Sequence, residues 1–206
     1  CGSYSADWGE VHGIDNNELI FCQPEGMEQA LDIAYALQQA GVEFIVIDSI
    51  AAMLPTKEID TDLVDSVQMG LRAKALNSYH GKFQSYNNTL ERNGKLPTTV
   101  LAINQFREKL GGYGDTTTVP GGNSQKFTNS LEIRTRVGDY IKEGTGSNAR
   151  IVGRIVKWKL QKNKTGTAFV DGEYDLYIDD GLLPRGSIDT AKELVILAMV
   201  KGIIER

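Results

Sequence analysis

The sequence predicts an α/β fold in which a central parallel sheet is extended by antiparallel strands. Its first half alternates short apolar segments with a segment of helical periodicity, joined by short connections. This order is typical of parallel strands linked by a right-handed crossover. The second half contains three segments of alternating apolar and polar residues separated by glycine-rich turns, which is the pattern of antiparallel strands.

The first half predicts a strand, a helix and a second strand. "ELIFCQP" (Glu18–Pro24) reads as a short buried strand that ends at proline. A helix is expected from Met27, where apolar residues recur at helical spacing, and Gly41 stands where a helix C-cap belongs. Glu43–Ile47 then predicts a second buried strand that runs directly into Asp48.

Two further elements and a long loop follow. A helix is expected from about Ser66 to Glu91, and "TTVLAIN" (Thr98–Asn104) predicts a third buried strand. The glycine-rich segment after Asn104 has no apolar periodicity. A loop of this length in a compact domain is usually either functional or disordered, and both readings remain open.

The remainder predicts three antiparallel strands within 130–141, 149–163 and 172–181, and a last helix from Ser187 to Val200. We therefore expect a partial core domain over residues 1–186. Residues 187–206 are expected to be the start of a truncated C-terminal helical segment.

Composition and motif content argue against several classes of protein. The net charge of −5 argues against a uniformly basic nucleic-acid binder, although a local basic groove remains possible. No apolar run reaches the roughly 18 residues of a membrane span, so no membrane partner is expected. Two cysteines suit a reducing interior and a cytoplasmic location. Neither metal-ligand spacing of histidines nor a G-x-S-x-G motif occurs.

Asp48 is the first candidate site residue. A carboxylate at the end of a parallel strand lies where such sheets bind ligands, and it can support Mg²⁺ on nucleotide phosphates. The alternative is an ordinary acid that caps a turn or a helix. The usual phosphate-binding partner, G-x-x-x-x-G-K-[ST], does not occur in the 206 residues.

Amides, glycines and lysines are the other candidates. Asn104 and Gln105 end the third strand, where they either sense a phosphate oxygen or satisfy the loop backbone. Gly121–Gly122 would allow backbone amides to approach phosphates closely. A basic stretch around "KWKLQKNKTG" is either a solvated face or a surface that meets phosphates.

Together these segments resemble the RecA-type recombinases of bacteria and phages. The resemblance is carried in order by "SADWGEVHGID", "FIVIDSIAAMLPTKEI", "DSVQMG", "LAINQFREKLG", "PGGNSQKF" and "QKNKTGTAF". It implies a RecA-like P-loop NTPase core that uses ATP and Mg²⁺ in homologous recombination. It also implies single-stranded and double-stranded DNA as partners, and self-association as a filament or another homo-oligomer.

The resemblance assigns the nucleotide side of the site. Asp48 matches the Walker B acid that supports Mg²⁺, with Ser49 beside it, and Gln105 matches the glutamine that senses the γ-phosphate. Trp8 falls where the family has an aromatic residue beside adenine. Lys162 and Lys164 match lysines that reach the ATP of a neighbouring subunit.

The resemblance also assigns the DNA side. A first DNA-binding loop is expected at about 60–70, and Lys74 takes the place of a basic residue in the helix that follows it. A second DNA-binding loop is expected at 106–123, and Phe127 matches a packing residue of the subunit interface. The DNA-binding candidates within the two loops are Met69, Gly70, Arg107, Gly121, Gly122 and Asn123.

The departures from the family pattern shape the functional expectation. The family's first strand, phosphate loop and following helix have no counterpart in the sequence, and its catalytic glutamate would fall at or before Cys1. We therefore expect little or no ATPase activity from this chain by itself. The alternatives are a non-catalytic DNA-binding module that modulates a recombinase filament, or a related RecA-fold motor of the helicase type.

Overall fold

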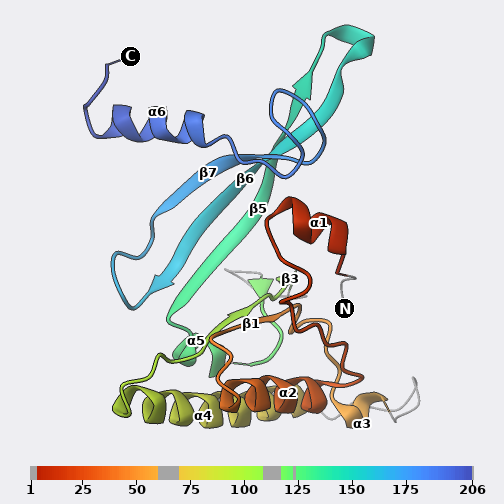
Figure 1. Ribbon diagram of the computed structural model, residues 1–206, viewed down its shortest axis with the longest axis vertical. Helices are drawn as coiled ribbons and strands as arrows, with labels where there is room; N and C mark the ends of the chain where they lie inside the picture. Colours follow the sequence, from red (N-terminus) through yellow and green to blue (C-terminus); the bar gives the residue numbers. More distant parts are fainter. Residues whose placement is uncertain (1–3, 60–69, 109–116, 123, 206) are drawn as a thin grey trace. The chain divides into compact units, whose positions relative to one another are not determined.

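The computed structural model describes residues 4–59, 70–108, 117–122 and 124–205. The chain divides into two compact units (Figure 1). Unit 1 comprises Ile20–Asn129, and unit 2 comprises Tyr4–Leu19 together with Ser130–Arg206.

Unit 1 is built on a parallel pair of strands. β1 (Phe44–Ile47) pairs with β2 (Thr99–Ala102) in a register that sets Ile47 opposite Ala102. The connection between them contains α3 (Thr56–Ile59) and α4 (Leu71–Arg92). This confirms the predicted parallel sheet.

α2 (Met27–Gln39) and α4 lie side by side against the two strands (Figure 1). They cover one face of the sheet, where Ile45 joins a buried apolar cluster. The cluster consists of Met27, Leu31, Ala34, Ile45, Ile50, Met53, Leu76 and Tyr79. On the other face of β1, the side chains of Phe44 and Val46 are 57% and 52% exposed. The prediction of a fully buried strand is therefore wrong for alternate residues, because no described helix covers that face.

The C-terminus of α2 follows its predicted capping signal. Gly41 has φ = 91°, in the left-handed region where glycine carries no Cβ penalty. Its N–H donates to the carbonyl of Gln38, and the N–H of Val42 donates to the carbonyl of Leu37, both at 3.0 Å. These two bonds form a Schellman motif, which satisfies helix-end carbonyls and directs the chain into β1.

The strand predicted at Glu18–Pro24 is wrong. The segment has no strand structure, and Ile20 and Phe21 are 61% and 52% exposed. Its apolar residues suit a strand, but a strand needs a hydrogen-bonding neighbour. Among the described residues, β1 pairs only with β2, and no other strand pairs with this segment.

The glycine-rich segment after Asn104 contains short elements. β3 (Arg107–Glu108) pairs antiparallel with β4 (Thr117–Thr118), and α5 (Ser124–Thr128) follows. The described parts of this segment are thus partly ordered into secondary structure.

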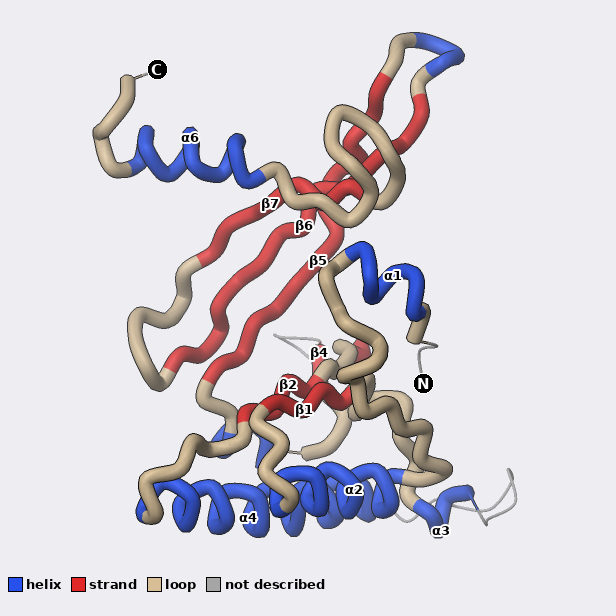
Figure 2. The backbone as a smooth tube through the Cα atoms, in the orientation of Figure 1, coloured by secondary structure: helices blue, strands red, loops and turns tan. Residues whose placement is uncertain are grey.

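Unit 2 contains a three-stranded antiparallel sheet (Figure 2). β6 (Arg150–Asn163) lies between β5 (Leu131–Glu143) and β7 (Asp171–Tyr177), and a short 3₁₀ turn (Gly146–Asn148) joins β5 to β6. The three predicted strands are confirmed. Their predicted place as an extension of the parallel sheet is not, because none of the described strands pairs across the two sheets. Short local turns favour antiparallel pairing, so these three strands make their backbone hydrogen bonds with one another.

Two helices complete unit 2. α1 (Ala6–Val11) begins after Ser5, whose side chain accepts a hydrogen bond from the N–H of Trp8. α6 (Thr190–Val200) begins after Asp189, which caps the N–H of Lys192 at 2.9 Å. Over the ranges described, no helix combines the length and the apolar character that crossing a membrane requires.

Candidate functional site

The ends of β1 and β2 bring two of the predicted site segments together. Beyond the paired strands, the N–H of Ile103 donates to the carbonyl of Ile47, and the N–H of Ile50 donates to the carbonyl of Ile103, both at 2.9 Å. These bonds hold Asp48 and Ser49 beside the end of β2. Asp48 is exposed and Ser49 is buried, so the carboxylate is available at the carboxyl edge of the parallel pair, where such sheets bind ligands.

Asn104 connects this edge of the sheet to the segment that contains Pro120 and Gln125. Its Nδ2 donates to the carbonyl of Pro120 at 2.9 Å and to Oε1 of Gln125 at 3.0 Å. Its Oδ1 accepts from the N–H of Gln105 at 2.9 Å. Gln125 is 8% exposed, and its Nε2 donates to the same Pro120 carbonyl at 2.7 Å. Asn104, Pro120 and Gln125 form a bridge, called the amide bridge below, from the end of β2 to the glycine pair and α5.

The glycine pair Gly121–Gly122 packs directly on α4. A Cβ at Gly121 would lie 2.4 Å from Cδ1 of Leu76, and a Cβ at Gly122 would lie 2.8 Å from Cβ of Ala73. Both glycines also have positive φ, 104° and 77°. Glycine is required here both for the backbone conformation and for the close approach to the helix.

The same turn of α4 carries two more predicted DNA-binding residues. Gly70 precedes the helix with φ = 101°, and its carbonyl accepts from the N–H of Lys74 at 2.9 Å. Lys74 is exposed. The fold therefore gathers Gly70, Lys74, Gly121 and Gly122 at the beginning of α4.

The remaining predicted residues of unit 1 are less tightly held. Gln105 follows Asn104 and is exposed, and Arg107 is exposed on β3. Phe127 is 77% exposed on α5, two residues after the buried Gln125. Met69 and Asn123, like Cys1, lie outside the described residues.

In unit 2, Lys162 and Lys164 flank Asn163 at the end of β6. Lys162 pairs with Glu132 in the sheet register, and the N–H of Lys164 donates to the carbonyl of Ser130 at 2.9 Å. Oδ1 of Asn163 accepts from the N–H and the hydroxyl of Thr165. This Asx-turn fixes the backbone between the two lysines.

Trp8, also in unit 2, already has a partner on its ring. The guanidinium carbon of Arg185 lies 4.5 Å from the ring centroid of Trp8, which is a cation–π contact. His12 meets the same indole edge-on, at 4.7 Å between centroids. Trp8 is half-buried as a result.

These residues fit ATP and Mg²⁺ only in part. One exposed carboxylate at a strand end suits Mg²⁺, which keeps most of its waters and takes phosphate oxygens. When bound, the metal ion would neutralise phosphate charge. Among the described residues no three acidic, histidine or cysteine side chains gather as a metal cage, and the sequence contains no phosphate-loop motif.

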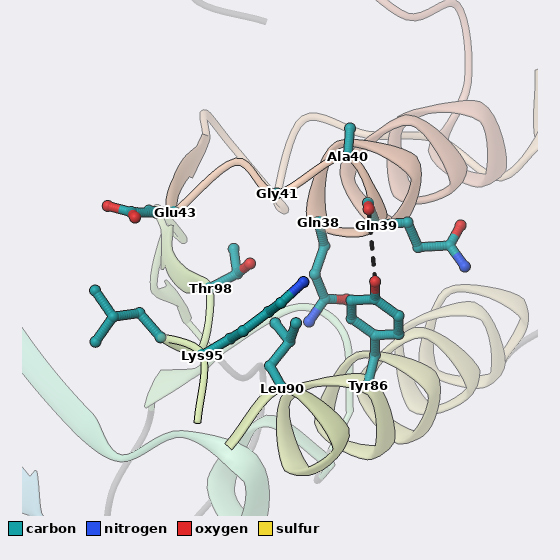
Figure 3. Close-up of a pocket in the computed structure, with 10 residues that line it drawn as sticks. Gln38, Gln39, Ala40, Gly41, Glu43, Tyr86, Leu90, Lys95 and Thr98 are labelled. Atoms are coloured by element: carbon teal, nitrogen blue, oxygen red, sulfur yellow. Dashed lines mark hydrogen bonds between the residues drawn. The ribbon is translucent and has the colours of Figure 1, made fainter. Parts of the chain in front are cut away.

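A pocket of about 350 Å³ lies at the opposite, amino-terminal ends of β1 and β2 (Figure 3). Glu43 and Thr98, which precede the two strands, line it together with Lys95 and Tyr86. Two of the lining residues share a partner in α4, because Asn87 donates to the carbonyl of Thr98 and accepts from Nε2 of Gln38. None of the predicted site residues lines this pocket, which lies where the C-terminal ends of α2 and α4 meet the starts of the two strands.

Burial changes the pKa of two neighbours in α4. It raises the pKa of Tyr79 to about 12 and lowers the pKa of His80 from its ordinary value. Both shifts come from packing of α4 rather than from the candidate site.

Two residues of these arrangements were not predicted. Gln125 lies within "PGGNSQKF", but nothing in its spacing marks it as the partner of Asn104, 21 positions away. Arg185 is a single arginine in a loop, and no sequence signal relates it to Trp8.

Comparison with known proteins identifies the family. The model of the RecA N-terminal domain matches residues 3–183. Protein RecA of Lactococcus lactis subsp. cremoris (strain MG1363) is 35% identical over 202 residues, covering 97% of this chain and 49% of that protein. Protein RecA of Halalkalibacterium halodurans is 37% identical over 188 residues, covering 90% of this chain and 51% of that protein. The chain thus spans about half the length of the relatives it matches. On these matches, the chain belongs to the RecA family.

Proposed function

We propose that the chain is part of a homologous-recombination protein that binds single-stranded DNA, with ATP and Mg²⁺ at subunit interfaces, and promotes strand exchange. Family membership supports the general role. It also favours a recombinase over a helicase-type motor.

The observation that carries the proposal is the amide bridge. It joins the edge that holds Asp48, Asn104 and Gln105 to Gly121–Gly122, and these glycines pack on the beginning of α4. If a phosphate displaced Gln105, the movement would be transmitted to the DNA-binding candidates through two hydrogen bonds and one close packing contact. This is a direct physical route for ATP to alter DNA affinity.

Each remaining residue has a part in this proposal. Asp48, with Ser49 beside it, supports Mg²⁺, and Trp8 contacts the adenine ring. Lys162 and Lys164 approach the nucleotide of a second copy, and Phe127, exposed on α5, packs at that interface. Lys74 and Arg107 meet DNA phosphates, and the Gly121–Gly122 amides approach the backbone closely.

A second candidate function is a DNA-binding module without ATP response. The observation that favours it is the absence of a G-x-x-x-x-G-K-[ST] motif from the 206 residues. Phosphate contacts from Lys74 and Arg107 would still bind DNA, but nothing would cradle the triphosphate.

Both candidate functions are tested by the fluorescence anisotropy of a labelled oligo-dT, measured with and without ATP and Mg²⁺. The recombinase role predicts DNA affinity that rises with ATP, and that Gln105→Ala abolishes the rise without abolishing binding. Affinity unaffected by ATP supports the module. Absence of DNA binding at low salt contradicts both.

A further inference from the structure

Arg185 lies over the ring of Trp8 and belongs to a loop of unit 2 that is held by several hydrogen bonds. The N–H of Arg185 donates to Oδ1 of Asp180 at 2.9 Å, and the N–H of Gly186 donates to the carbonyl of Tyr177 at 2.8 Å. Arg150 in turn donates to the carbonyl of Asp180 and lies 3.8 Å from the carboxylate of Asp179. The backbone that carries Arg185 is thus fixed at several points.

Gly186 allows this loop to meet α1. Its φ is 85°, and a Cβ there would lie 2.2 Å from Cγ1 of Val11. Only glycine permits this approach, which places the neighbouring Arg185 over the indole of Trp8, one turn earlier in α1. The contact follows from backbone packing as well as from the attraction between guanidinium and ring.

A planar guanidinium on an indole face makes the same kind of contact as a stacked purine ring. The two cannot occupy one face together. We propose that Arg185 is a residue of the base-binding site, which covers the face of Trp8 and yields it when adenine binds. The inference rests on the proposed function only in taking Trp8 as the adenine contact.

Removal of Arg185 therefore strengthens adenine binding. A cation–π contact at a partly exposed site corresponds to a change in affinity of about two- to fivefold. Arg185→Ala should lower the Kd for ATP by that factor, and Arg185→Lys, which keeps the charge but loses the planar group, should have a smaller effect.

The test uses the intrinsic fluorescence of Trp8. The chain has two tryptophans, so Trp158→Phe leaves Trp8 as the only tryptophan, which can be excited selectively over tyrosine. In that background, titration with ATP and Mg²⁺ is compared between the parent, Arg185→Ala and Arg185→Lys. Inorganic tripolyphosphate is the probe without a base. Arg154→Ala is the matched control, because Arg154 makes a second cation–π contact in unit 2, over Tyr140 at 5.7 Å.

Tighter ATP binding by Arg185→Ala, with greater acrylamide quenching of Trp8 and no change in Arg154→Ala, supports the inference. Unchanged or weaker ATP binding by Arg185→Ala overturns it. It is also overturned if ATP leaves Trp8 emission unchanged in every variant, or acts as tripolyphosphate does. In those cases, binding of oligo-dT that responds to ATP would show that the proposed function stands without this residue.

Discussion

Asn104 and Gln125 share a hydrogen bond of 3.0 Å that fastens the end of β2 to α5. Since Gln105 directly follows Asn104, and Gly121–Gly122 precede α5, the bond couples the nucleotide-sensing and DNA-binding candidates of unit 1. The predictions below test this coupling and the packing that supports it.

Asn104→Ala should lower the free energy of unfolding by about 2 kcal/mol, because it removes two donated bonds and leaves the buried Gln125 Oε1 without its donor. Urea denaturation followed by circular dichroism measures this. The control is Asn88→Ala, which removes only an exposed bond to Gln84 within α4 and should cost less than about 0.5 kcal/mol. Equal stability of the two variants would contradict the role of the bridge.

Two glycine substitutions should change stability in opposite directions. Gly121→Ala places a Cβ 2.3 Å from Nε2 of Gln125 at a positive φ and should cost about 3 kcal/mol or more. Gly81→Ala lies within α4 with nothing within 4 Å of the new Cβ. It should raise stability by about 0.5–1 kcal/mol.

Thermal denaturation of both glycine variants checks the packing of the glycine pair on α4. If Gly121→Ala were as stable as the parent, the close approach between Gly121 and Leu76 would be wrong. Gly81→Ala controls for the general effect of alanine on the chain.

Tyr79 should make stability fall at alkaline pH. Burial raises its pKa to about 12 in the folded state, above the ordinary value of about 10 in the unfolded chain. The stabilising contribution is complete below pH 10 and is lost as pH rises towards 12. Between pH 9 and pH 11, the parent should lose about 1 kcal/mol more than Tyr79→Phe.

Chemical denaturation of the parent and Tyr79→Phe across this range measures the difference. At neutral pH the substitution should cost little, because the buried Oη of Tyr79 has no hydrogen-bond partner among the described residues. Identical pH profiles would show that Tyr79 is accessible to solvent.

The sequence predicted the elements whose signals are local. α2 follows from its apolar spacing and from Gly41, and β5 to β7 follow from alternation. The strand at Glu18–Pro24 failed because composition cannot supply a pairing neighbour.

Among the candidate residues, Asp48 and Asn104 were predictable as ends of parallel strands, which share one edge of the sheet. The Asn104–Gln125 and Trp8–Arg185 contacts were not. Each joins residues distant in sequence through tertiary packing, and neither residue type nor spacing signals such a pair.

The 206-residue chain by itself should not hydrolyse ATP at a measurable rate, with or without single-stranded DNA. Asp48 is the proposed Mg²⁺-supporting residue, but the sequence contains no G-x-x-x-x-G-K-[ST] motif to hold the phosphates. A coupled phosphate-release assay measures this, with Asp48→Asn as the control for contaminating activity. Robust turnover that Asp48→Asn abolishes would contradict the prediction.

The most direct test of the proposed DNA-binding surface of unit 1 is the salt dependence of oligo-dT binding. For single strands, the slope of log K against log salt changes by about 0.7 for each neutralised phosphate. Lys74→Ala should weaken binding and make the slope less steep by about this amount, whereas Lys82→Ala, two turns further along α4, should leave the slope unchanged. A slope of zero for the parent, or equal slopes for the parent and Lys74→Ala, would contradict the account.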